Sequence, residues 1–148
     1  MGILNLTPDS FYDGSKLSEN NIIQKFNKVA LSDIVDIGAE SSRPGAEPLE
    51  EKEEIDRISK FLNLNINHKC LSIDSYKKNV IEFCLKSGFN MINDISGGGN
   101  KFENIDIAAK YNVPIVLMHM KGNPKNMQNN PKYNDVIDDL LSFFENRI

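Results

Sequence analysis

Cysteine is scarce in this sequence, and basic residues do not outnumber acidic ones. The two cysteines, Cys70 and Cys84, form no CxxC pair and each lies in an apolar run, so we expect buried, reduced thiols in a cytoplasmic protein. The 17 lysines and arginines against 21 aspartates and glutamates give a formal net charge of −4. This balance argues against nucleic acid as a partner, because binding a phosphate backbone requires clustered cations.

Long hydrophobic runs are also missing. No stretch approaches the roughly 20 apolar residues of a membrane-spanning helix, and the chain does not open with the basic and apolar regions of a secretory signal. We therefore expect neither a membrane partner nor a cleaved leader. The 148 residues, 40% of them hydrophobic, are enough for the core of one domain over residues 1–148.

Five short apolar runs recur along the chain, and segments with the apolar spacing of amphipathic helices lie between them. The runs are nearly continuous in apolar residues, as in strands of a parallel sheet that are buried on both faces. They are GILNL (2–6), IVDIGA (34–39), CLSID (70–74), MINDI (91–95) and IVLMHM (115–120). This alternation predicts an α/β fold of about five βα units, with parallel strands and outer helices.

Two α/β architectures compete for this pattern. A doubly wound sheet concentrates its ligand site at one switch point, whereas a (β/α)8 barrel places polar residues at the carboxyl ends of many strands. Each predicted strand here ends in polar residues, among them Asn5, Glu40, Asp74, Asn93 and His119. The pattern favours the barrel. Because five units cannot close eight strands, we expect an incomplete TIM (β/α)8 barrel, with an open sheet as the alternative.

Three local features predict where helices begin. Ser18 is expected to cap a helix over residues 18–30, and Ser75 to cap the helix that follows the third strand. The acidic run EEKEE (50–54) is predicted to be the solvated first turn of a helix over residues 49–62, near the positive end of its dipole.

Polar residues at two neighbouring strand ends are candidates for binding a ligand. Asp74 ends the third predicted strand and Asn93 the fourth, and a carboxylate with an amide offers donors and acceptors to the edge of a heterocycle. Asp94 should point the opposite way, because successive strand residues alternate between faces. His119 has no second His or Cys at ligand spacing, so a hydrogen-bonded structural role is favoured.

Two loops contain residues that turn formation does not explain. In NLTPDSFYDG (5–14), Phe11 has no periodic apolar partner; it either packs on the rim of the barrel or forms a lid over a flat substrate. In GAESSRPGAEP (38–48), Arg43 precedes a Pro-Gly turn and follows two serines. The planar guanidinium suits a phosphate or carboxylate; a solvent-exposed ion pair is the alternative.

Five motifs run in order along the whole chain: MGILNLTPDSFYDG (1–14), DIGAESSRPGAEP (36–48), LSIDSYKKNVI (71–81), MINDISG (91–97) and VLMHMKGNPKNMQNNPKY (116–133). Together they resemble the dihydropteroate synthase family of pterin-binding TIM barrels, from its N-terminal to its central part. Related corrinoid-linked methyltransferases share the barrel and its Asp and Asn, but usually not the first two motifs.

The resemblance implies a transferase of folate biosynthesis, a sulfonamide target that condenses p-aminobenzoate with (7,8-dihydropterin-6-yl)methyl diphosphate to give 7,8-dihydropteroate and diphosphate. It implies catalytic roles for Asp74 and Arg43, and Mg²⁺ as cofactor with Asn5 as its ligand. The implied substrate-binding residues are Ser42, which with Arg43 touches the phosphates; Asp74 and Asn93 on the pterin edge; Ile95 and Met118 on the pterin faces; and Phe11 and Pro44 around p-aminobenzoate.

The resemblance also implies contacts for which this sequence has no counterpart. The second half of the family supplies another pterin-binding Asp, a Lys in a Ser-Arg-Lys segment and an Arg–His pair at the phosphates. We therefore expect the 148-residue chain alone to be weak or inactive. The frequent homodimer of the family is not carried over, because its contacts come largely from that half. The alternatives are a folate-dependent methyltransferase and a non-catalytic, truncated pterin-binding module.

Overall fold

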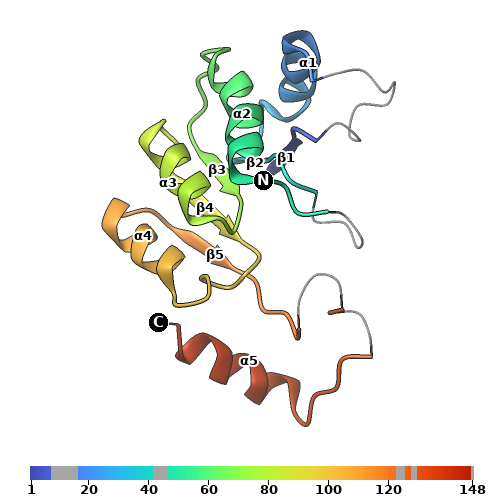
Figure 1. The fold of residues 1–148 in the computed structure, drawn as a ribbon, viewed down its shortest axis with the longest axis vertical. Coiled ribbons are helices and arrows are strands. Elements are labelled where there is room, and N and C mark those ends of the chain that lie inside the picture. The colour runs from blue at the N-terminus through green and yellow to red at the C-terminus, as the bar shows by residue number, and fades with distance from the viewer. Residues whose placement is uncertain (8–16, 42–46, 123–125, 128–129, 148) are drawn as a thin grey trace.

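The structure, a computed structural model, describes residues 1–7, 17–41, 47–122, 126–127 and 130–147. Five parallel strands form one sheet, and a helix follows each strand in the chain (Figure 1). The strands are β1 (Gly2–Asn5), β2 (Val35–Gly38), β3 (Leu71–Asp74), β4 (Met91–Asp94) and β5 (Ile115–Leu117). The helices are α1 (Glu19–Val29), α2 (Glu51–Leu62), α3 (Lys78–Lys86), α4 (Glu103–Tyr111) and α5 (Val136–Glu145).

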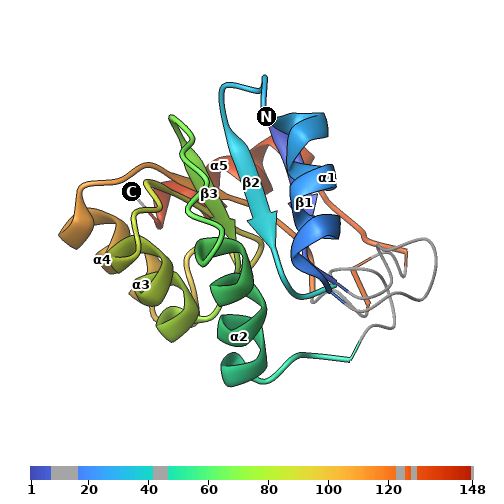
Figure 2. The same ribbon diagram turned by 90° about the horizontal axis from the view of Figure 1, so that it is seen from above.

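The strand order identifies the architecture. The strands pair in the order β1-β2-β3-β4-β5, and helices α1 to α4 pack side by side in the same order. Helices α1 to α4 form one layer along one face of the curved sheet (Figures 1 and 2). A doubly wound sheet would reverse its strand order and carry helices on both faces. The predicted α/β fold, five βα units of an incomplete barrel, is therefore confirmed.

Helix α5 does not belong to that layer. It lies apart from α1 to α4, beyond the connection that follows β5 (Figure 1). The Phe143 ring meets the His119 ring edge-on with centroids 4.7 Å apart, and Arg147 Nε donates to the Gly97 carbonyl oxygen over 2.6 Å. Helix α5 thus packs against the loops at the carboxyl ends of the strands, and none of its residues is buried.

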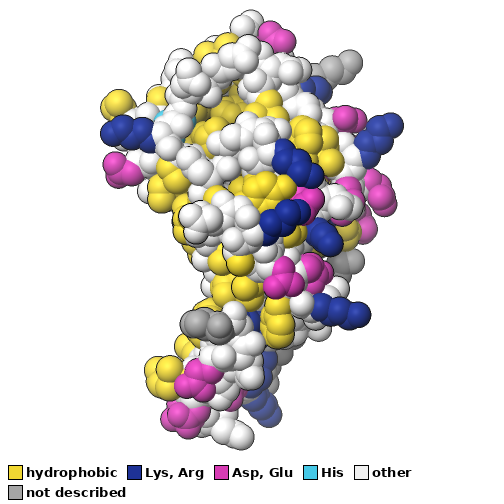
Figure 3. Space-filling model, turned by 90° about the vertical axis from the view of Figure 1, so that its left-hand side faces the viewer, with side chains coloured by type: hydrophobic (Ala, Val, Ile, Leu, Met, Phe, Trp, Pro, Cys, Tyr) yellow, Lys and Arg dark blue, Asp and Glu magenta, His cyan; other side chains and the backbone are white. Residues whose placement is uncertain are grey.

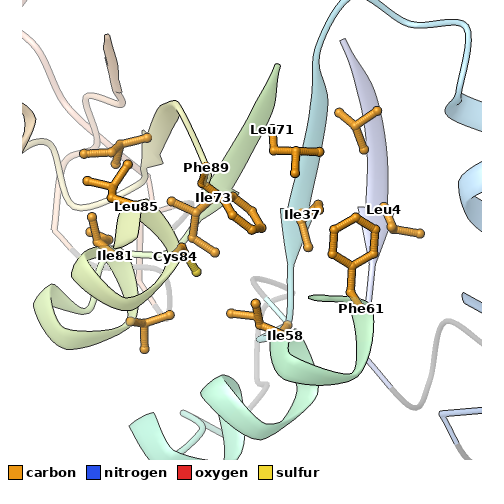
Figure 4. Packing of buried hydrophobic residues seen from close by; sticks show 14 of the residues in the cluster. Leu4, Ile37, Ile58, Phe61, Leu71, Ile73, Ile81, Cys84, Leu85 and Phe89 are labelled. Carbon is orange, nitrogen blue, oxygen red and sulfur yellow. The ribbon is translucent and has the colours of Figure 1, made fainter. Parts of the chain in front are cut away.

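The core lies between the sheet and α1 to α4. Residues in register on neighbouring strands, Leu4, Ile37, Ile73 and Ile92, form one row that is buried from solvent. Helix residues complete the cluster, among them Ile58, Phe61, Ile81, Cys84 and Leu85 (Figure 4). Because strand side chains alternate, the other set of residues faces the concave side of the sheet.

The outer surface of α3 and α4 carries charges of both signs. Lys86 and Lys110 each contact the Glu82 carboxylate, at 3.3 and 3.1 Å. Acidic and basic side chains lie interspersed over the side of the molecule that is at the left in Figure 1 (Figure 3).

None of the helices formed by the described residues combines the length and the apolar character needed to cross a bilayer.

Two predictions about helix starts have different outcomes. Ser18 caps α1 as expected, because its Oγ accepts from Asn21 N over 3.4 Å. Ser75 does not cap α3, which begins only at Lys78. Its Oγ accepts instead from Lys77 N over 3.2 Å, in a turn before the helix. The prediction for Ser75 was wrong because Lys77 stays extended, with its side chain committed to acidic partners elsewhere.

Only one of the two cysteines is buried as expected. Cys84 has no exposed surface, and its burial raises the pKa of the thiol. Cys70 is half-buried, because it precedes β3 at the edge of the core rather than lying within it. Both thiols are free.

Candidate active site

Three residues predicted for the site lie in one row at the carboxyl ends of neighbouring strands. Asn5 is in register with Gly38, Gly38 with Asp74, and Asp74 with Asn93. Residues in register on parallel strands project to the same face. Asn5, Asp74 and Asn93 therefore converge on the concave face, opposite the helix layer.

Gly38 makes room for two of these side chains. A Cβ atom at Gly38 would lie 3.1 Å from Asp74 Oδ2 and 3.4 Å from Asn5 Oδ1. Both oxygens therefore lie next to a position that has no side chain. The space beside Gly38 is thus bordered by one amide oxygen and one carboxylate oxygen.

Asp74 is held where its charge is disfavoured. Burial raises its pKa from 3.8 to about 7, and the neighbouring carboxylates of Asp36, Glu54 and Glu40 add to the rise. A carboxyl with such a pKa exchanges its proton near neutral pH, and it prefers to ionise beside a positive charge. The surroundings of Asp74 are therefore suited to a ligand that carries or develops positive charge.

Asn93 is oriented by a residue that the sequence analysis missed. Its Nδ2 donates to Asp36 Oδ2 over 2.9 Å, across the strand that separates β2 from β4. Asp36 is only 3% exposed. A signal was present, since Asp36 is a charged residue inside the apolar run IVDIGA and stands an even number of positions from Gly38.

Asp94 faces away from this row, as expected from strand alternation. It accepts hydrogen bonds from Ser96 N and Ser96 Oγ, over 2.7 and 2.6 Å, and from Gly98 N and Asn104 Nδ2, each over 2.9 Å. These bonds shape the β4–α4 loop. Asp94 is therefore a structural residue. In the glycine-rich segment after it, the backbone N–H of Gly98 binds this carboxylate and is not available to a ligand.

Ile95 and Met118 flank the row. Ile95 follows β4 directly, and Met118 N donates to the Asp94 carbonyl oxygen over 3.2 Å. Both residues are half-buried. Met118 was expected within a strand over residues 115–120, but β5 ends at Leu117. Beyond the end of this strand, the His119 ring packs edge-on against the Phe143 ring.

An ion cluster lies beside the row and corrects the prediction for the acidic run 50–54. Glu54 is 1% exposed rather than solvated, and Lys77 Nζ lies 2.6 Å from its Oε2. Lys77 also donates to Glu40 and to the Leu49 carbonyl oxygen. Burial would lower the pKa of Lys77, but its bonds to Glu40 and Glu54 outweigh burial and raise it.

Four predicted residues lie outside the described part of the chain: Phe11, Ser42, Arg43 and Pro44. The attachment points of the second loop are described. Leu49 N donates to Glu40 Oε2 over 2.8 Å, and Arg57 Nη1 donates to the Ala39 carbonyl oxygen over 2.8 Å. These bonds, together with those of Lys77, connect residues on both sides of the segment 42–46 to helix α2 and to the residue before α3.

The family of this chain follows from its similarity to known proteins. The family model described as "Pterin binding enzyme" matches residues 1–148. The chain belongs to the pterin binding enzyme family. This member is 42% identical to the dihydropteroate synthase of Bacillus subtilis over 96% of its own length and 49% of the relative.

Solved structures of the pterin binding enzyme family share the fold. A Yersinia pestis dihydropteroate synthase in complex with a sulfonamide drug is 39% identical, with a TM-score of 0.82 over 99% of this chain and 55% of that one. A Xanthomonas albilineans dihydropteroate synthase with 4-aminobenzoic acid is 33% identical, with a TM-score of 0.81 over 99% and 53%. The present chain thus spans about half the length of these relatives, which are TIM barrels.

Proposed function

We propose that this protein takes part in the dihydropteroate synthase reaction of folate biosynthesis. In that reaction, p-aminobenzoate and (7,8-dihydropterin-6-yl)methyl diphosphate give 7,8-dihydropteroate and diphosphate. The observation that carries the proposal is the row of Asn5, Asp74 and Asn93 on one concave face of a chain from this family. The relatives that bind a sulfonamide drug or 4-aminobenzoic acid support p-aminobenzoate as the second substrate.

Asp74 and Asn93 bind the edge of the pterin in this proposal, and Ile95 and Met118 contact its faces. The C–O bond between the pterin methylene and the diphosphate breaks, and its electron pair leaves with the oxygen. The methylene that remains shares its positive charge with the ring. Asp74 stabilises this charge, because a cation beside it favours the ionised form of a carboxyl whose pKa is about 7. The nitrogen of p-aminobenzoate then bonds to the methylene carbon and loses a proton.

The β1–α1 and β2–α2 loops supply the other proposed contacts. Ser42 and Arg43 bind the phosphates, where a bidentate guanidinium is well matched to the charge on the leaving oxygens. Phe11 and Pro44 surround p-aminobenzoate. These four roles rest on the resemblance of the two loop motifs to the family. The described residues on either side of 42–46 are joined by hydrogen bonds, because Leu49 N donates to Glu40 and Lys77 donates to the Leu49 carbonyl oxygen.

Mg²⁺ is the cofactor that we propose, with Asn5 as its protein ligand. Within the described ranges, no three His, Cys, Asp or Glu side chains are grouped so that they could hold a metal ion. A single protein oxygen from Asn5 is enough for a site that the substrate completes, because Mg²⁺ commonly binds one or two protein oxygens and takes its other ligands from phosphates and water. Asn5 Oδ1, beside Asp74 Oδ2 above Gly38, is such an oxygen. The ion would neutralise negative charge that develops on the diphosphate.

The proposed reaction is tested by following p-aminobenzoate incorporation and diphosphate release together, with and without Mg²⁺. We expect equal amounts of both products from the natural protein that carries this sequence. Replacing Asp74 by Asn should lower turnover at least about a hundred-fold, whereas the same change at the exposed Asp56 should leave it unaltered. Folate-dependent methyl transfer without diphosphate release would indicate the methyltransferase alternative. Pterin binding without turnover would indicate a binding module.

A second test compares the activity of the 148-residue chain with that of a full-length relative. Purified by itself, it should turn over far more slowly than a full-length relative, because the phosphate and pterin contacts that the family draws from its second half have no counterpart here. Equal rates would refute that expectation.

We also propose the cytoplasm as the compartment, because the free thiols of Cys70 and Cys84 persist in a reducing environment.

A further inference from the structure

Asp36 is a buried carboxylate on the concave face, and packing of the core does not explain why a charged residue stands there. It projects from the middle of β2 to the concave face, one layer below the row of Asn5, Asp74 and Asn93. Its Oδ2 accepts from Asn93 Nδ2, while its Oδ1 is buried and has no hydrogen-bond partner among the described residues. A buried carboxylate left half-satisfied costs stability and is therefore expected to have a functional reason.

The hydrogen bond between Asp36 and Asn93 settles which way the Asn93 amide is turned. The oxygen and nitrogen of an amide occupy opposite arms of a plane, and an ionised carboxylate can only accept. The Nδ2 arm therefore points to Asp36, over 2.9 Å, and the Oδ1 arm points away from it. A wrongly turned amide would place two oxygen acceptors against each other.

We infer that Asp36 is the positioning residue for Asn93: by holding Nδ2, it presents Oδ1 to the site, so that the ligand edge bound there must donate an N–H. The inference rests on the proposed function, because it takes the pterin as the ring that Asn93 meets. A pterin edge carries N–H groups as well as ring nitrogens that accept. Asp36 thus selects the face of the ring and its register in the site, without touching the reacting atoms.

Asp36 is also bordered by a second buried polar group. Ser72, its register partner on β3, is fully buried, and its Oγ likewise has no hydrogen-bond partner among the described residues. No lysine or arginine is recorded in an ion pair with Asp36 in the described part of the chain. Among the described residues, the hydrogen bond from Asn93 is the one favourable interaction found for the Asp36 carboxylate, whose charge also opposes ionisation of Asp74 and so raises its pKa.

The test is a double-mutant cycle on pterin binding in the natural protein that carries this sequence. Dissociation constants for 6-hydroxymethylpterin are measured for the wild type, Asp36→Asn, Asn93→Ala and the double variant. An Asn at position 36 can donate as well as accept, so the Asn93 amide is no longer held in one orientation. We expect Asp36→Asn to weaken binding about ten- to hundred-fold in the wild-type background, and less than about two-fold when Asn93 is already Ala.

Controls separate this role from a purely structural one. The exposed Asp56→Asn should leave pterin affinity unchanged, and the KM for p-aminobenzoate should stay constant in Asp36→Asn. An equal loss of affinity in both backgrounds, or no loss in either, would overturn the inference.

The amide resonances of Asn93 provide a measurement on the wild type that needs neither a folded variant nor a ligand. The NH₂ protons should be shifted downfield and protected from exchange by the bond to Asp36. Free, rapidly exchanging NH₂ protons would contradict the inference. A wild type that binds no pterin overturns the proposed function, and the same resonances then still decide whether Asp36 orients Asn93.

Discussion

Lys77 Nζ lies 2.6 Å from Glu54 Oε2, which joins the start of α3 to the start of α2 through a carboxylate that is 1% exposed. The same ammonium group contacts Glu40, at the base of the loop that follows β2. One lysine thus compensates two carboxylates beside the candidate site. The arrangement is costly to disrupt, because removing one member leaves buried charge without a partner.

Replacing Lys77 by Met should destabilise the protein by about 3–5 kcal/mol, since Glu54 and Glu40 would remain in place without their cation. Urea denaturation at neutral pH measures the loss. Lys110, which pairs with Glu82 on the surface, offers a matched control, and Lys110→Met should cost no more than about 1 kcal/mol. Similar losses for both variants would contradict the central role given to Lys77.

Asp74 should make the folded state more sensitive to rising pH. Its pKa is raised from 3.8 to about 7 on folding, so the unfolded chain ionises first and the free energy of unfolding falls as pH rises from about 4 to about 7. Above that range both states are ionised and the contribution levels off. Asp74→Asn should therefore stabilise the protein by about 1–3 kcal/mol near pH 8 and have little effect near pH 4.

Thermal unfolding of Asp74→Asn and the wild type across this pH range provides the measurement, with Asp56→Asn as the exposed control. A stability difference that does not change with pH would show that the Asp74 carboxyl titrates normally.

Gly38 should be needed for activity more than for folding. A methyl group there would lie 3.1 Å from Asp74 Oδ2, so this oxygen would have to shift by a few tenths of an ångström, and it would touch Asn5 Oδ1 at 3.4 Å. We expect Gly38→Ala to lower kcat/KM at least about ten-fold. Its free energy of unfolding should change by less than about 1.5 kcal/mol.

Gly88 supplies the opposite control. It has a positive φ of 100° and open space around its Cβ position, so Gly88→Ala should cost about 1 kcal/mol of stability and leave kcat/KM unaltered. An unchanged kcat/KM in Gly38→Ala would show that the free space beside Gly38 is not needed for activity.

Asp94 should be important for stability and not for substrate chemistry. Asp94→Ala removes the acceptor for Ser96, Gly98 and Asn104 in a buried loop, so we expect a loss of about 3–4 kcal/mol. Asp106→Ala, an exposed change on the same α4 unit, should cost less than about 1 kcal/mol. Chemical denaturation of the two variants makes the comparison. Full stability in Asp94→Ala would show that its hydrogen bonds are dispensable.

Much of the site could be predicted because it depends on local order along the chain. Apolar runs identified the strands, and the polar residue at the end of each run identified Asn5, Asp74 and Asn93. The two-residue period of a strand predicted that Asp94 would turn away from Asn93, and it does. Each of these inferences uses the period of one segment, and parallel pairing then brings the strand ends together.

Other features required contacts between segments that are distant in the sequence. Glu54 was expected in solvent because its neighbours are charged, but Lys77, 23 residues away, draws it into a buried pair. Ser75 was expected to cap α3, but Lys77 is extended and occupies the position before the helix instead. Asp36 was counted within an apolar run, and its partner Asn93 stands 57 residues further on.

Residue order along this chain specified the βα units, the register partners and the polar strand ends, because backbone hydrogen bonding and side-chain alternation act over a few residues. The pairing of Lys77 with Glu54, the turn of the Asn93 amide and the clearance above Gly38 arise only when the sheet curves and its strands lie side by side. Which charged groups are buried, and therefore need an oppositely charged partner, depends on the whole fold.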